Sequence, residues 1–270
     1  MRNLRNMSRF LASAAAVAML ATGLAGCQTT SPNVTGSLGA RAEARAPEDT
    51  KRNADDAAER FRANPKDVEA ALNYGQSLRA NGQRSQAVAV LEQATIANPG
   101  NKALLAAYGR ALADNGNLQQ AFDTLAQAHS PQDPNWRVLS VQGAVLDQQG
   151  KHKEAQRYYA SALKIAPEEP SVLSNLGLSY ILTKDLPKAE STLQRALAKG
   201  GNADPRIRQN LALAIGLQGR YAEAETIAKA DLPPEEAEAN VAYLKQLMNG
   251  NDEKKRRGVN TATAADRNRS

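Results

Sequence analysis

The chain has 270 residues, 42% of them hydrophobic, and a formal net charge of +6. Its single cysteine excludes an internal disulfide framework and a multi-cysteine metal site. A basic chain ordinarily suggests a nucleic-acid partner, but here the excess charge lies in the first nine residues and in the last twenty, and the body between Cys27 and Gly250 is balanced at 25 basic against 25 acidic residues. We therefore expect no nucleic-acid partner.

The N-terminal residues 1–26 have the organisation of a signal peptide. Three arginines without an acid precede the short, nearly uncharged run 10–24, which is too short to cross a membrane comfortably. The sequence "LAGC", which ends at Cys27, resembles the lipobox of bacterial lipoproteins. The resemblance implies that Cys27 is lipidated and begins the mature chain, and Gln28 is compatible with export to the outer membrane, facing the periplasm. The alternative is an ordinary signal peptide with a chance cysteine.

The rest of the chain can be divided into segments that differ in amino-acid composition. Residues 27–50, which begin with the lipidated cysteine, are small and polar without apolar periodicity, and this predicts a disordered tether. Residues 51–64 predict an N-terminal capping helix, and residues 250–270 predict a basic disordered tail. The segment between them is rich in Ala, Leu, Gln and Glu, which favours helix.

Four segments of this middle part are versions of one sequence with a period of 34 residues. The residues that repeat in phase are glycine, alanine, an apolar residue and a second alanine. The glycines are Gly75, Gly109, Gly143 and Gly177, and the first alanines are Ala87, Ala121, Ala155 and Ala189. The pattern resembles the tetratricopeptide repeat, in which two antiparallel helices meet at small residues in positions 8 and 20. Gly82, Gly116, Gly150 and Gly219 are predicted to form the turns between paired helices.

A fifth copy aligns after one inserted residue, with Ala212 and Ala224 in the two small positions and Arg208 where an apolar residue is expected. Residues 233–249 begin with prolines and carry one apolar stripe, which predicts a closing helix. We therefore predict an all-α tetratricopeptide-repeat solenoid of about five helix-turn-helix repeats over 65–232, with a C-terminal capping helix at 233–249. The resemblance implies a shallow arc with a concave face.

Catalytic chemistry has few candidates in this chain. The only histidines, His129 and His152, are predicted to be solvated loop residues, and no phosphate-binding loop or metal-ligand motif occurs. We therefore expect no enzyme, no cofactor and no metal site. Trp136, at the start of the third repeat, is expected to pack on a neighbouring turn rather than to bind a ligand.

Family geometry implies that the first helices supply the concave face, where a protein or peptide partner binds. The groove is expected to change from polar and charged to apolar along its length. Two interpretations stay open for its leucines: they bind a partner, or they pack against the capping helix. The expected groove residues are Asn73, Gln76, Arg79, Arg110, Asn175, Leu178, Ile181, Leu182, Asn210, Leu213 and Leu217, with Glu69 and Asp114 beside the first four.

The stretches around 134–156 and 230–248, together with the anchor and five repeats, resemble the tetratricopeptide lipoprotein of the tight-adherence (Flp) pilus assembly system. This resemblance implies a non-enzymatic outer-membrane lipoprotein that helps the pilus secretin to assemble or to reach its membrane. The alternative is a general periplasmic scaffold that docks peptidoglycan enzymes or outer-membrane barrel-assembly components. In both cases we expect a protein partner and no small-molecule substrate.

Overall fold

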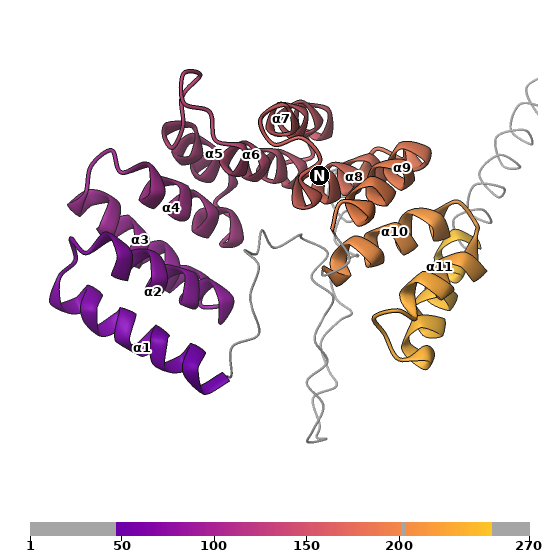
Figure 1. The fold of residues 1–270 in the computed structure, drawn as a ribbon, viewed down its shortest axis with the longest axis horizontal. Helices are drawn as coiled ribbons and strands as arrows, with labels where there is room; N and C mark the ends of the chain where they lie inside the picture. Colours follow the sequence, from indigo (N-terminus) through magenta and orange to yellow (C-terminus); the bar gives the residue numbers. More distant parts are fainter. Residues whose placement is uncertain (1–46, 201–203, 250–270) are drawn as a thin grey trace, which may run out of the picture. The chain divides into compact units, whose positions relative to one another are not determined.

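Helices account for most of the described chain. The computed structural model describes residues 47–200 and 204–249, and within them twelve helices and no strand are present (Figure 1). The helices are α1 (Pro47–Ala63), α2 (Val68–Ala80), α3 (Arg84–Ala97), α4 (Lys102–Asp114), α5 (Leu118–Gln127), α6 (Trp136–Gln148), α7 (His152–Ile165), α8 (Pro170–Leu182), α9 (Leu186–Ala198), α10 (Pro205–Leu217), α11 (Tyr221–Ala228) and a last helix at 234–249. The predicted signal peptide 1–26, Cys27, most of the tether and the tail 250–270 lie outside the described residues.

In the first four repeats, the first helix starts at the same position of the 34-residue period. Asp67, Asn101 and Asn135 are the N-caps of α2, α4 and α6, and each side chain accepts a backbone N–H of the first turn, as Asp67 Oδ1 does from Ala70 at 2.9 Å. Glu169 makes no such bond before α8, where Pro170 occupies the first turn instead. Asp204 caps α10 one residue later than the period of 34 requires, so the inserted residue predicted before the fifth copy is confirmed.

Close approach of paired helices explains the periodic glycines. A Cβ atom on Gly75, Gly109, Gly143 or Gly177 would lie 2.5 to 2.7 Å from a side-chain carbon of the partner helix, a distance that van der Waals radii forbid. The large residue that fills this space belongs to position 24 of the repeat, as Leu91 does against Gly75. The alanine of position 20 is also fully buried, as Ala87 is at 0% exposure, and the carbonyl oxygen of Ala121 lies 3.3 Å from a Cβ added to Gly109.

Each turn between paired helices contains a residue with left-handed backbone conformation. Gly82, Gly116, Gly150 and Gly219 have φ between 72 and 86°, which confirms the turns that the glycines predicted. The fourth repeat has Lys184 at this place, with φ of 60°. Lysine is less favourable than glycine in this conformation because its Cβ lies too close to the following carbonyl oxygen.

Both ends of the repeat array are covered by an additional helix. At one end α1 packs on α2 and buries Ala57, Ala58 and Phe61. This helix begins at Pro47 rather than at residue 51, because proline is favoured in the first helical turn, so the last residues of the predicted tether are helical. At the other end the helix at 234–249 buries Ala237, which confirms the capping helix of the predicted fold.

Near the start of the fifth repeat, a charged residue occupies a position where an apolar residue is expected. Arg208 occupies the place where an apolar residue was expected, and its Nε donates to Asp231 Oδ2 at 2.6 Å. Asp231 lies just after α11, so the ion pair joins α10 to the end of its partner helix. The helix therefore starts normally at Pro205 although its apolar pattern is interrupted.

Each repeat packs on the next mainly through its second helix, α3 on α4, α5 on α6, α7 on α8 and α9 on α10, and the first helices also contact one another. α2 packs against α4, α4 against α6, α6 against α8 and α8 against α10, so these five helices form one contiguous layer, here called the first-helix layer. In the described residues, successive second helices share no comparable contact. Within the same residues, every helix falls short of the length and hydrophobicity needed to cross a membrane.

Candidate partner-binding surface

The polar end of the expected groove lies on α2 and α4. Asn73 and Gln76 are exposed on α2, as expected of groove residues. Arg79, near the end of α2, reaches α4, where its Nε donates to Asp114 Oδ2 at 2.6 Å. The Arg79 side chain is 16% exposed and that of Asp114 33%, so this ion pair joins the first two repeats in a partly desolvated place.

Arg110 lies beside this pair, one helical turn before Asp114 on α4. Its Nε atom is buried and has no hydrogen-bond partner among the residues that the structure describes. Burial lowers the pKa of Arg110, and the nearby charges of Arg79 and Arg137 lower it further, whereas Asp114 acts in the opposite direction. Two positive charges and one carboxylate from three successive first helices therefore act on Arg110.

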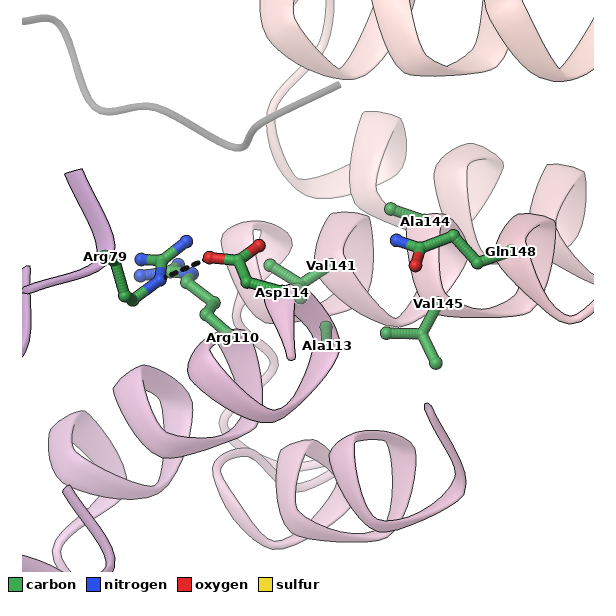
Figure 2. A pocket seen from close by; sticks show the side chains of 8 residues that line it. All are labelled: Arg79, Arg110, Ala113, Asp114, Val141, Ala144, Val145 and Gln148. Atoms are coloured by element: carbon green, nitrogen blue, oxygen red, sulfur yellow. Dashed lines mark hydrogen bonds and ion pairs between the residues drawn. The ribbon is translucent and has the colours of Figure 1, made fainter. Parts of the chain in front are cut away.

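A small, open hollow adjoins these charges. Figure 2 shows Arg79, Arg110 and Asp114 toward one side of the hollow, with Val141 next to Asp114, and Ala144, Val145 and Gln148 of α6 toward the other side. Charged, polar and small apolar side chains of α2, α4 and α6 therefore line this hollow together.

The two asparagines of the later repeats serve inter-repeat contacts. Asn175 Nδ2 donates to Ser140 Oγ at 3.2 Å, and Asn210 Nδ2 donates to Ser174 Oγ at 3.3 Å. Each bond joins one first helix to the first helix before it, α8 to α6 and α10 to α8. Both side chains are half-buried, so they contribute to stacking and present only part of their surface.

The apolar end of the expected groove is more buried than the sequence indicated. Leu178, Leu213 and Leu217 are half-buried and pack on the core cluster that includes Ala237 of the last helix, which favours the packing interpretation for these three. Ile181 was placed wrongly, because it is only 8% exposed and belongs to that core. Leu182 alone of the five is well exposed, at 46%.

His129 lies in the loop after α5 as predicted, but both histidines are less solvated than predicted. His152 is the first residue of α7, and its Nδ1 lies 2.9 Å from Asp147 Oδ1. His129 Nε2 lies 3.0 Å from Oε1 of the buried Gln142. Both rings are partly buried, so they take part in packing between helices.

Trp136 packs as expected, half-buried against a core cluster of the third repeat. Its neighbour Arg137 was not among the expected groove residues, although its guanidinium lies 4.2 Å from the Trp136 ring centre and close enough to Arg110 to affect its pKa. The α6 residues of the hollow were also missed. Ala144 and Gln148 occupy the repeat positions that supply Arg110 and Asp114 one repeat earlier, so extending that register to the third repeat would have found these two, but not Val141 and Val145.

No cluster of His, Cys, Asp or Glu suited to a metal ion is found within residues 47–200 and 204–249. Cys27, the expected lipidation site, lies outside these residues.

Comparisons with known proteins identify the tetratricopeptide repeat in this chain. Two family profiles, both described as tetratricopeptide repeat, match residues 75–135 and 148–215. No curated protein sequence matches the chain significantly.

Solved structures show the same fold at low sequence identity. A chain of the APC/C hetero-tetramer Cut9-Hcn1 superposes with a TM-score of 0.63 and 16% identity, over 74% of this chain and 40% of that one. The match therefore spans less than half the length of that relative. TTC0263, a thermophilic TPR protein from Thermus thermophilus, superposes with a TM-score of 0.57 and 22% identity, over 66% of this chain and 98% of that one. The chain thus carries tetratricopeptide repeats and, in its described residues, folds as a tetratricopeptide-repeat solenoid with a capping helix at its C-terminal end.

Proposed function

We propose that this protein is a non-enzymatic outer-membrane lipoprotein that binds the secretin of a tight-adherence (Flp) pilus and assists its assembly or localisation. The observation that carries the binding part is the contiguous first-helix layer, which presents exposed amides at Asn73 and Gln76 and an exposed leucine at Leu182. Solenoids of this kind serve as protein-interaction scaffolds because stacked repeats offer one extended surface. A large apolar side chain on such a surface favours a protein partner.

The membrane part of the proposal rests on the sequence "LAGC" ending at Cys27. Acyl chains on that cysteine would hold the folded repeats at the membrane, since each buried methylene adds to the free energy of insertion. The secretin part rests on the resemblance of residues 134–156 and 230–248 to the pilus lipoprotein.

Lipidation is tested by the variant Cys27→Ser. We expect labelled palmitate to enter the natural chain and not the variant, and the natural chain to fractionate with outer membranes. Equal labelling of both chains would contradict the anchor.

Partner binding is tested by Leu182→Glu, with Ile165→Glu on the second helix α7 as the matched control. Both side chains are exposed, at 46% and 41%, so neither change should unfold the protein. A charge buried without a partner in an interface is costly, so we expect Leu182→Glu to weaken secretin capture by about tenfold or more and Ile165→Glu to leave it unchanged.

The readouts are the amount of secretin that co-purifies with the lipoprotein and the amount found in outer membranes. If the lipoprotein captures peptidoglycan enzymes or barrel-assembly components in place of the secretin, the general scaffold function replaces the proposed one. If Leu182→Glu and Ile165→Glu behave alike, binding does not use the first-helix layer at Leu182.

A further inference from the structure

The last helix exposes two large apolar side chains on one face. Tyr243 is 63% exposed and Leu247 is 47% exposed, and because they are four residues apart they lie on the same side of the helix. The helix packs on its repeat with a different side, where Ala237 is buried and Leu244 meets Gly216 of α10. An apolar face therefore remains uncovered at this end of the array.

The helix at the other end of the array has the outer face expected of a cap that meets only water. Over residues 53–63, α1 exposes charged and polar side chains and no large apolar one. Terminal helices of repeat arrays ordinarily have such polar outer faces, because no further repeat covers them. Tyrosine at a protein surface is typical of interfaces. The difference between the two ends therefore indicates that another protein surface covers the last helix.

Negative charge lies at the start of the same helix. Glu236 is seven residues before Tyr243, so it belongs to the same face. In the described residues, Glu238 is paired with Lys229 at 3.3 Å, whereas Glu235 and Glu236 have no ion pair. The uncovered face is thus acidic at its start and apolar toward its end.

Positive charge follows the helix in the sequence. Residues 250–257 contain four basic residues against two acids, the basic ones being Lys254, Lys255, Arg256 and Arg257. When two copies of one helix pack antiparallel, the start of each lies beside the end of the other. Acidic starts and basic ends would then meet twice, once on each side of the apolar contact.

We propose that two copies of this protein associate through their last helices, packed antiparallel about a two-fold axis, with Tyr243 of each copy against Leu247 of the other. In a two-fold pair the same surface of both copies meets, so each apolar patch covers its equivalent. In this register, Glu235 and Glu236 of one copy lie beside the chain that follows the last helix of the other.

The association uses a surface outside the first-helix layer, so it does not depend on which protein that layer binds. A dimer would present two first-helix layers at once. Linked binding sites raise the apparent affinity for a partner that itself contains several copies.

Sedimentation velocity of the full-length protein in detergent, at a series of protein concentrations, measures the association. The contact is small, so we expect a dimer that dissociates on dilution at concentrations on the order of micromolar. Tyr243→Glu and Leu247→Glu should each weaken the dimer by about tenfold or more, because a charge would be buried without a partner. Ile96→Glu is the matched control, since Ile96 is 74% exposed on α3, and it should leave the dimer unchanged.

Charge reversal tests the antiparallel register. One variant carries Glu235→Lys with Glu236→Lys, and the other carries Lys254→Glu with Lys255→Glu. Each variant alone should dimerise about tenfold more weakly, because like charges meet at both ends of its contact. An equal mixture should recover the natural dimer, because opposite charges meet again at both ends of the mixed pair. Circular dichroism melting checks that every variant is folded.

A monomer at every concentration would overturn the proposal, as would a dimer that Tyr243→Glu and Leu247→Glu leave intact. A mixture of the charge-reversed variants that associates no better than either alone would refute the antiparallel pair. If the natural protein is monomeric and Tyr243→Glu abolishes secretin capture, the face binds the partner and not a second copy. A dimer lost in both apolar variants, with secretin absent from all captures, would support the pairing and refute the secretin.

Discussion

Asp147 is one of the residues that join the third and fourth repeats through polar contacts. Its Oδ1 accepts from Ser179 Oγ at 2.9 Å and lies 2.9 Å from His152 Nδ1, and its Oδ2 accepts from the Tyr159 hydroxyl at 3.0 Å. Ser179 belongs to α8 and the other residues to α6 and α7, so one carboxylate links three helices. A buried acceptor with several donors is favourable only while the donors remain in place.

Tyr159 should make stability depend on alkaline pH. Burial, and then the Asp147 charge and hydrogen bond, raise the pKa of Tyr159 well above 10. The unfolded chain loses this proton near pH 10 and the folded chain keeps it, so the free energy of unfolding is maintained below pH 10 and falls as the pH rises above it. Tyr159→Phe should lower the free energy of unfolding by about 1 kcal/mol at neutral pH, because Asp147 loses a donor, and should make the alkaline decline shallower.

Urea unfolding of both proteins between neutral pH and pH above 10 measures the two slopes. The variant retains Tyr108, whose pKa is raised to about 12, so some alkaline decline should persist in both. Stability curves that run parallel over the whole pH range would mean that Tyr159 ionises equally in the folded and unfolded chains.

At the scale of the helix pair, the glycine of position 8 is required by packing rather than by backbone conformation. Gly177 lies inside α8, and a Cβ added to it would be 2.5 Å from Leu193 Cγ on α9. Leu193 is itself fully buried, so it has no space into which to move.

Gly177→Ala should therefore destabilise the protein by about 1 to 3 kcal/mol, although alanine is the better helix former by about 1 kcal/mol. In a Leu193→Ala background the clash is absent, so there the same change should be neutral or stabilising. The double-mutant cycle, measured by chemical denaturation, gives the coupling free energy. Additive effects of the two changes would show that the helices do not cross at these residues.

The repeat could be predicted from sequence because the interactions that produce it are local and recur along the chain. The cap residues, turn glycines and small crossing residues each act within one helix pair, and four copies share one register that the fifth follows after one inserted residue. The placement of Ile181 could not be predicted in this way, because its burial depends on how α8 packs with α10 and with the helices after it. The charges that act on Arg110 could likewise not be predicted, since they come from side chains of three repeats that the fold places together.

At the scale of the molecule, each repeat contacts mainly its neighbours. Contacts run from α1 to α2 at one end and from α9 to α10 and α10 to α11 at the other, and no packing between the two ends is present in the described residues. In such an array stability is close to a sum of repeat and interface contributions, so damage at one end need not spread to the other. The last helix is the natural place to test this, because Gly216 of α10 meets Leu244 there, with a would-be Cβ 2.5 Å from Leu244 Cδ2.

Leu244→Glu should detach the last helix from α10, because the half-buried leucine would be replaced by a charge that has no partner at the Gly216 contact. Amide hydrogen exchange followed by mass spectrometry should then show lost protection in α10 and α11, with protection in α2 to α5 unchanged. Gln246→Glu adds the same charge at an exposed position of the same helix and should leave the whole pattern as in the natural protein. Protection lost equally in every repeat would mean that the array unfolds as one cooperative unit, and unchanged protection in α10 would mean that the last helix does not stabilise the repeat it covers.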